Sequence, residues 1–165
     1  MNYRSVVNVI GFILVFLGLS MVFSIGWSIY YSDDLHFSRD CMALVKAMAI
    51  TVFSGLILAF GTYSKKKEKL STRDGFAIVT FGWILMTFFS AIPFYFSDMG
   101  SYTDCFFEAM SGLTTTGASI LNDIESLSHG ILFWRSFTHF IGGMGIIVFS
   151  IAILPLLGAG GVQLF

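Results

Sequence analysis

The sequence predicts an all-α integral membrane protein: an N-terminal transmembrane hairpin followed by one repeat of helix, pore loop and helix. Hydrophobic residues make up 56% of the 165 residues and charged residues only 12%, whereas a soluble domain has about 25% charged residues. The apolar residues also gather in four long blocks, and one short polar stretch lies between the last two blocks. So few charged residues cannot cover a water-exposed surface, which excludes the soluble classes.

The four apolar blocks are long enough to cross a membrane as helices. They cover about residues 6–31, 41–63, 75–96 and 130–157, and each exceeds the roughly 20 residues that span the hydrocarbon core. Arg4 precedes the first block, as in a signal peptide, but this block is longer than an h-region of about 7–15 residues. We therefore expect an uncleaved helix, and we divide the chain into a hairpin over residues 1–70 and a repeat over residues 71–165.

Basic and acidic residues set the expected orientation. The connection after the second block carries most of the basic residues: Lys65, Lys66, Lys67, Lys69 and Arg73. The connection over residues 97–129 has no Lys or Arg and carries these acidic residues: Asp98, Asp104, Glu108, Asp123 and Glu125. The positive-inside rule then places the N-terminus and the basic connection in the cytoplasm. We expect a multi-pass protein of the cytoplasmic (inner) membrane. The outer acidity either concentrates cations at a pore mouth or reflects only the lack of positive charge in outer loops.

A short helix is expected over residues 103–113, within this acidic connection. Ser101 and Asp104 have the spacing of a capping box, with Asp in the place of Glu or Gln. At 1.5 Å per residue the helix reaches roughly 16 Å, about half of the hydrocarbon core. It enters from the outside, so the negative end of its dipole faces the membrane interior and favours a cation there.

The polar stretch Thr114–Ser119, TTTGAS, follows this short helix. Polar backbone at membrane depth is tolerated only where it packs in protein or faces a water-filled path. In an ion filter, backbone carbonyls replace the hydration shell of a cation. Gly117 reaches a positive φ at low cost, and the threonines add hydroxyl oxygens, which suit hard cations. The alternative is a Thr-rich re-entrant turn that binds no ion.

Arg135 is expected to find an acidic partner. An arginine at the centre of the hydrocarbon core costs roughly 2.5–3.5 kcal/mol on insertion scales. An ion pair would also tie the fourth helix to the polar loop. We expect the partner among three residues of the acidic connection: Glu108, Asp123 and Glu125.

Small residues in the fourth block leave two interpretations open. Gly142, Gly143 and Gly145 either pack closely against the short helix or form a hinge that moves in gating. His139 likewise is either a packed, hydrogen-bonded histidine or a proton relay. Elsewhere, Cys41 and Cys105 lack the spacing of a metal site, so we expect unpaired thiols, with a disulfide as the alternative.

The chain resembles the Trk/Ktr/HKT superfamily of potassium transporters. The segment MSGLTTTGASIL, residues 110–121, is similar to the first filter loop of that family, and residues 134–165 are similar to the helix that follows it. The first two blocks resemble the extra N-terminal hairpin of TrkH-type subunits. This resemblance implies that oxygens of Thr115, Thr116, Gly117 and Ala118 bind potassium and that no organic cofactor is needed. Ser119 stands where potassium channels have a second glycine.

The resemblance also implies partners, and it raises the question of how a chain with a single filter loop could form an ion site. It implies the remaining three repeats of a transporter, a homodimer of the full protein, and a cytoplasmic nucleotide-binding ring of the TrkA type. One loop cannot surround an ion, so we expect a fragment of a longer transporter. A homotetrameric cation channel, a separately encoded remainder and a non-conducting membrane protein stay open. No nucleophile–base pair or phosphate loop is visible, and neither an enzyme nor a nucleic-acid partner is expected.

Overall fold

The computed structural model describes residues 2–31, 37–62 and 71–153. Within these ranges the chain is helical, with no strand. The helices are α1 (Tyr3–Tyr30), α2 (Phe37–Gly61), α3 (Thr72–Ser90), α4 (Ile92–Phe96), α5 (Tyr102–Leu113) and α6 (His129–Ile153). The predicted all-α fold is therefore confirmed. The Lys65–Lys69 cluster and the end of the fourth block, residues 154–157, lie outside the described residues.

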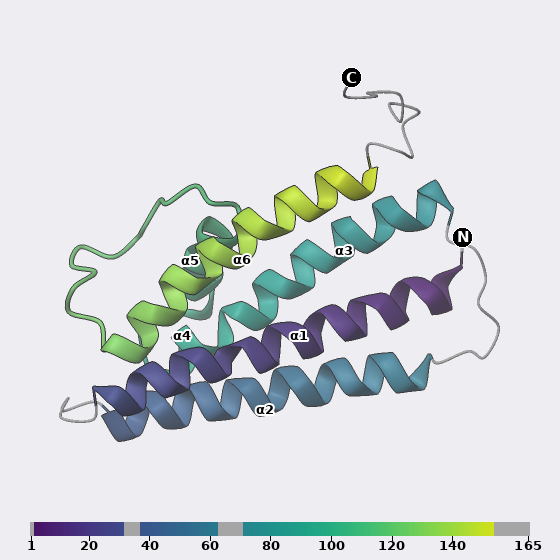
Figure 1. The fold of residues 1–165 in the computed structure, drawn as a ribbon. Coiled ribbons are helices and arrows are strands. Elements are labelled where there is room, and N and C mark those ends of the chain that lie inside the picture. Colours follow the sequence, from purple (N-terminus) through teal and green to yellow (C-terminus); the bar gives the residue numbers. More distant parts are fainter. Residues whose placement is uncertain (1, 32–36, 63–70, 154–165) are drawn as a thin grey trace.

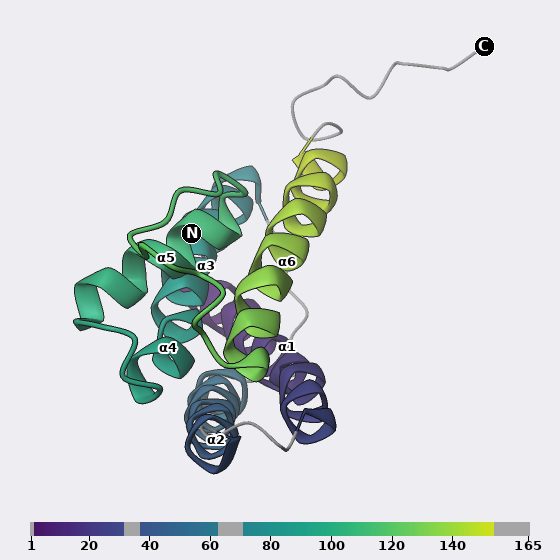
Figure 2. The same ribbon diagram turned by 90° about the vertical axis from the view of Figure 1, so that its left-hand side faces the viewer.

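The long helices α1, α2, α3 and α6 run side by side along one axis, and the short α4 and α5 lie near one end (Figure 1). The start of α1, the end of α2, the start of α3 and the end of α6 lie together at the other end. Seen along the axis in Figure 2, α1 and α2 form a pair on one side, while α3, α4 and α5 lie beside α6. This up-and-down arrangement agrees with the expected order of crossings.

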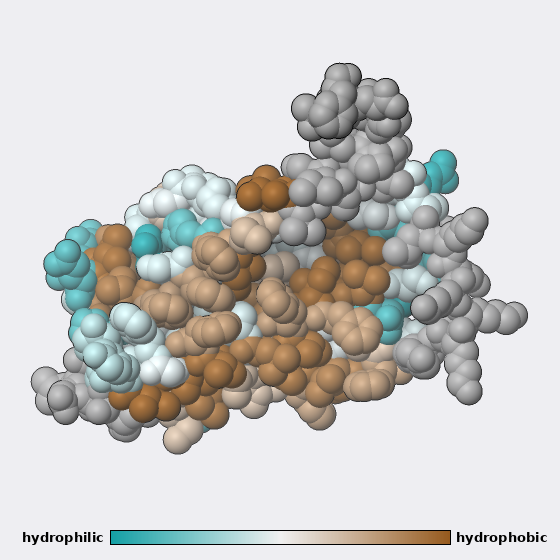
Figure 3. Space-filling model, in the orientation of Figure 1, coloured by the Kyte–Doolittle hydropathy of each residue, from teal (hydrophilic) through white to brown (hydrophobic). Residues whose placement is uncertain are grey.

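Among the residues that the structure describes, three helical segments are long and apolar enough to cross a membrane: Tyr3–Tyr30, Arg39–Gly61 and Thr72–Phe96. The fourth apolar block forms α6, whose 25 residues measure about 37 Å at 1.5 Å per residue. Large apolar side chains of α1 and α2 point outward, among them Phe16 and Phe60 at 66% and 73% exposure. Figure 3 shows such residues as a brown belt between more polar ends, as expected for a surface in contact with lipid.

Close packing joins α1 to α2. A Cβ at Gly11 would lie 2.8 Å from the Gly55 carbonyl oxygen, so only a glycine lets the two backbones approach this far. Asn8 donates a hydrogen bond to the Ala59 carbonyl. Leu14 and Leu17 complete the contact as fully buried side chains.

The third apolar block is broken near its C-terminal end, which the sequence analysis did not anticipate. It was expected as one helix over residues 75–96, but α3 ends at Ser90 and α4 begins at Ile92. Pro93 explains the break, because proline lacks the N–H that would continue the helical hydrogen bonds. The Trp134 indole donates a hydrogen bond of 3.0 Å to the Ser90 carbonyl. This bond joins α6 to the broken segment, on which α5 also rests.

Candidate functional site

The short helix α5 carries the candidate site at its C-terminal end. It begins at a capping box: the Ser101 hydroxyl accepts a hydrogen bond from the Asp104 N–H, and the Asp104 carboxylate accepts one from the Ser101 N–H. The expected start is therefore confirmed. Residues three, four and seven apart line the buried face of α5: Cys105, Glu108, Ala109 and Gly112. This face packs against α6 and α3, which fixes the direction of the helix.

Two glycines bring the end of α5 against α6. A Cβ at Gly142 would overlap the Leu113 carbonyl, and one at Gly112 would overlap the Thr138 hydroxyl. Gly142 therefore serves close packing, the first of the two interpretations left open. A Cβ at Gly145 would lie 3.4 Å from the Trp83 ring. A Cβ at Gly143 would lie 4.0 Å from the Thr115 methyl, so Gly143 faces the polar loop.

The backbone turns sharply where α5 ends. The Thr115 and Thr116 N–H groups donate to the Gly112 and Ser111 carbonyls at 2.9 and 3.0 Å, which is the pattern of a Schellman motif. Thr115 takes the left-handed conformation, with φ at +57°, at a position where glycine is usual. Such a β-branched residue at positive φ is uncommon and costs of order 1–3 kcal/mol.

Gly117 is the second left-handed residue of the loop, with φ at +76°. This agrees with the expectation that a glycine relieves the backbone here. A Cβ at Gly117 would meet no atom within 4 Å, so conformation alone favours glycine. The loop from Thr114 to Ala118 is exposed in the described part of the chain. Its residues therefore border open space beside the buried end of α5.

Hydroxyl groups of the loop hold its shape. The Thr114 hydroxyl donates to the Met110 carbonyl at 2.8 Å and lies 2.8 Å from the Thr116 hydroxyl. The Thr115 hydroxyl donates to the Thr114 carbonyl at 2.7 Å. These bonds fix the side chains without involving the carbonyls of Thr115 or Gly117, which keep their lone pairs for an outside ligand.

Ser111 is a site residue that the sequence analysis missed. Its hydroxyl donates a hydrogen bond of 2.6 Å to the carbonyl of Ala118, a predicted ligand seven residues later. A carbonyl oxygen has two lone pairs, so Ala118 retains one for a cation. Ser111 is buried on α5. Its position on the helix face that turns toward the loop could have indicated from the sequence that it contacts the loop.

A buried ion pair connects α6 to the loop. Arg135 Nε lies 2.6 Å from Glu108 Oε1, and the Glu108 side chain is fully buried. The expectation that Arg135 pairs with an acidic residue of the connection is confirmed, with Glu108 as the partner. Asp123, another of the three candidates, instead accepts a hydrogen bond from the N–H of Glu125.

Glu108 also binds the far end of the polar loop. It accepts a hydrogen bond of 2.9 Å from the Ser119 hydroxyl and one of 3.3 Å from the Ile120 N–H. The Ser119 hydroxyl accepts the Leu121 N–H at 3.1 Å. We call the set Glu108, Arg135, Ser119 and Ile120 the brace, because it ties α5, α6 and the loop through one carboxylate.

The remaining polar groups near the site have ordinary structural roles. His139 Nδ1 lies 3.0 Å from the Arg135 carbonyl, one helical turn earlier, which matches the packed, hydrogen-bonded interpretation. Cys41 and Cys105 are free thiols, as expected. Among the described residues no group of three or more His, Cys, Asp or Glu is placed to hold a metal ion.

Comparison with known proteins decides the family. The model of the TrkH family of cation transport proteins matches residues 41–165. The chain belongs to the TrkH family. It is 36% identical to the Trk system potassium uptake protein TrkH of Escherichia coli K12, over 100% of this chain and 33% of that protein. The TrkG protein of the same strain is 36% identical, over 99% of this chain and 33% of its own length.

A solved TrkH-family structure has the same fold. The crystal structure of the potassium transporter TrkH from Vibrio parahaemolyticus matches with a TM-score of 0.86 at 35% identity, over 99% of this chain and 34% of that one. The chain thus spans about a third of the length of the relatives it matches. These relatives are transporters and not enzymes, and with its apolar helices the chain is a multi-pass membrane protein.

Proposed function

We propose that this chain supplies one of four filter loops of a protein that takes up potassium across the cytoplasmic membrane. The observation that carries the proposal is the Thr114–Ser119 loop, whose left-handed residues and exposed carbonyls follow a half-length helix. Thr115, Thr116, Gly117 and Ala118 supply the ion-binding oxygens, because carbonyl oxygens can replace a cation's hydration shell. Potassium is the transported ion and no organic cofactor takes part. The relatives named as potassium uptake proteins support the choice of ion.

The brace positions this loop. Glu108 receives hydrogen bonds from Ser119 and Ile120 while its charge is balanced by Arg135. Because both ends of the loop are then held, by the Schellman motif at Thr115 and by Glu108 at Ser119, the carbonyls between them are fixed before an ion arrives. Pre-organised oxygens avoid the cost of ordering the loop on binding.

Orientation follows from charge. The N-terminus and the basic connection at residues 65–73 lie in the cytoplasm, and the polar loop opens toward the outside. The C-terminal end of α5 then points inward, where its dipole favours a cation. Uptake is driven by the membrane potential, which contributes roughly 2.3 kcal/mol per 100 mV for one charge.

The complete site needs further loops. One loop supplies about a quarter of the oxygens around an ion, so three more repeats complete the filter. A homodimer of the full protein and a cytoplasmic nucleotide-binding ring of the TrkA type are the further partners we propose, by similarity to the family.

Growth of potassium-uptake-deficient cells tests the proposal. Cells that express the full-length protein containing this chain should grow at limiting potassium, and cells that express residues 1–165 alone should not. Surface labelling provides the control for insertion. Full-length protein that inserts normally and restores no growth would favour a non-conducting membrane protein. Rescue by residues 1–165 alone would instead favour a homotetrameric channel.

A further inference from the structure

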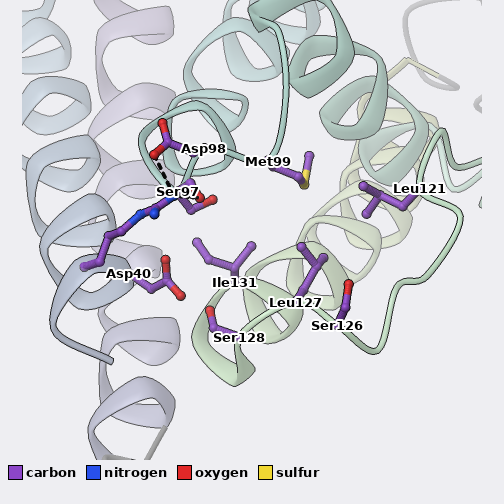
Figure 4. A pocket seen from close by; sticks show the side chains of 10 residues that line it. Asp40, Ser97, Asp98, Met99, Leu121, Ser126, Leu127, Ser128 and Ile131 are labelled. Carbon is purple, nitrogen blue, oxygen red and sulfur yellow. Dashed lines mark hydrogen bonds and ion pairs between the residues drawn. The ribbon is translucent and has the colours of Figure 1, made fainter. Parts of the chain in front are cut away.

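A second polar region lies apart from the filter loop. A pocket of about 300 Å³ occurs where the hairpin meets the repeat, at the end of the molecule at which α2 and α6 begin (Figure 4). Its walls come from the first turn of α2, the segment between α4 and α5, the connection before α6, and α6 itself. A water molecule takes about 30 Å³ in the liquid, so the pocket holds a small ion together with several waters.

Asp40 is the feature of this pocket that calls for a ligand. It is 5% exposed, and Figure 4 shows its carboxylate directed into the pocket. None of the described residues donates a hydrogen bond to it or pairs with its charge. The N-terminal end of α2 offsets part of its charge. The oxygens of Asp40 are not among the described polar atoms that are fully buried without a partner, so they open into the pocket, where a positive group would supply an ionic partner.

The neighbouring arginine does not supply that partner. Arg39 lies 2.6 Å from the Asp98 carboxylate and donates a hydrogen bond of 2.8 Å to the Ser97 carbonyl. Its guanidinium is thereby turned toward the segment between α4 and α5, and its charge is balanced by Asp98. Among the described residues no basic side chain balances the charge of Asp40, so the pocket carries one negative charge that the start of α2 offsets only in part.

Neutral oxygens complete the lining. The Ser128 hydroxyl is buried and has no hydrogen-bond partner among the described residues. The Ser126 hydroxyl donates to the Asp123 carbonyl at 2.8 Å, so its own lone pairs are available. Oxygen ligands of this kind suit hard cations. Calcium sites usually collect several carboxylates, whereas a single carboxylate with neutral oxygens and water matches an ion of one positive charge.

We propose that this pocket binds one partly hydrated alkali cation, with the Asp40 carboxylate and the Ser128 hydroxyl as protein ligands. No residue of the Thr114–Ser119 loop lines the pocket, so the site is separate from the filter and does not depend on it. Since its walls belong to both α2 and α6, an ion there connects the N-terminal hairpin to the repeat.

Anomalous diffraction with rubidium tests this site. Crystals of the full-length protein equilibrated with Rb⁺ should show an anomalous peak between Asp40 and Ser128. Asp40→Asn keeps the shape of the side chain and removes its charge, so it should raise the Rb⁺ concentration needed for half occupancy at least tenfold. Asp123→Asn is the matched control, because this exposed acidic residue lies outside the pocket, and it should leave the peak unchanged.

Two results would overturn the proposal: no pocket peak at saturating Rb⁺, or a peak that Asp40→Asn leaves intact. Ser128→Ala is a milder second variant that removes only a neutral oxygen, and it should weaken the peak without removing it. An ion bound at the Thr114–Ser119 loop would give a peak at a different position in the same crystals. Failure of the pocket site and failure of the filter are therefore distinguished in one experiment.

Discussion

The N-terminal hairpin and the repeat are both apolar, yet they use polar groups differently. In the hairpin, Asn8 joins α1 to α2 through the Ala59 carbonyl, while the hydroxyls of Ser20 and Thr51 donate to carbonyls of their own helices. In the repeat, buried polar groups bind across elements, as Trp134 does to the Ser90 carbonyl and Arg135 to Glu108. The hairpin is therefore held mainly by close packing, whereas directional bonds in the repeat place one loop. Substitutions in the hairpin should therefore affect stability alone, whereas substitutions in the repeat should also affect ion uptake.

The largest expected effect comes from breaking the brace. Glu108→Ala leaves the Arg135 charge buried without a partner and removes the acceptor of two loop donors. Loss of one member of a buried pair costs about 3–5 kcal/mol. We expect a decrease of this size in the free energy of unfolding in detergent, together with loss of Rb⁺ uptake.

A matched control and a charge exchange sharpen this prediction. Glu125→Ala changes an exposed carboxylate of the same connection that accepts no hydrogen bond among the described residues, and it should stay within about 0.5 kcal/mol of the original protein. The exchange Glu108→Arg with Arg135→Glu should restore part of the lost stability, but not all, because Ser119 and Ile120 lose their acceptor. Additive effects of the two exchanged residues would show that they do not interact.

Glycine substitutions in the two regions should separate stability from transport. Gly142→Ala would push a methyl group into the Leu113 carbonyl, and Gly11→Ala would do the same to the Gly55 carbonyl. Overpacking costs about 1–3 kcal/mol, so both variants should lower the thermal midpoint. Only Gly142→Ala should reduce Rb⁺ uptake per folded molecule, because it displaces the end of α5.

Gly26→Ala is the control for both glycine variants, since a Cβ there meets no atom within 4 Å. It should match the original protein in uptake and should not lower the thermal midpoint. Equal losses of uptake in Gly11→Ala and Gly142→Ala, measured at equal amounts of folded protein, would contradict the division between hairpin and repeat.

The smallest expected effect comes from one hydroxyl in each region. Ser111→Ala removes the hydrogen bond to the Ala118 carbonyl, and Ser20→Ala removes the bond to the Leu17 carbonyl. Each should cost about 1 kcal/mol. Competition of Na⁺ with Rb⁺ uptake should change in Ser111→Ala only, because that variant frees a filter carbonyl. An unchanged ion preference in Ser111→Ala would contradict the assignment of the Ala118 carbonyl as a filter ligand.

Local signals in the sequence predicted much of the fold. Apolar length predicted the bounds of α1 and α2 to within a few residues, and Ser101 with Asp104 marked the start of α5. The need of Arg135 for a charge partner was also visible, and the choice of Glu108 follows from its place on the buried face of α5. Pro93 lay inside an apolar block and was the overlooked sign of the break between α3 and α4.

Other features depend on contacts between distant segments. The left-handed conformation of Thr115 follows from how α5 ends, and no property of threonine favours it. The bond from Ser111 to Ala118 requires the loop to fold back on its own helix. The sequence analysis assigns no role to Asp40, and only the assembled walls around it show that this largely buried side chain faces a pocket.

Rubidium uptake by Gly117→Ala tests the central claim most directly. At φ +76° an alanine costs about 1–2 kcal/mol, and no neighbouring atom blocks its methyl group, so the strain falls on the loop backbone alone. With Gly26→Ala as control, at equal surface abundance, we predict that Gly117→Ala loses most Rb⁺ uptake or its preference for Rb⁺ over Na⁺. Uptake and ion preference equal to those of the control would contradict the assignment of Thr114–Ser119 as part of a potassium filter.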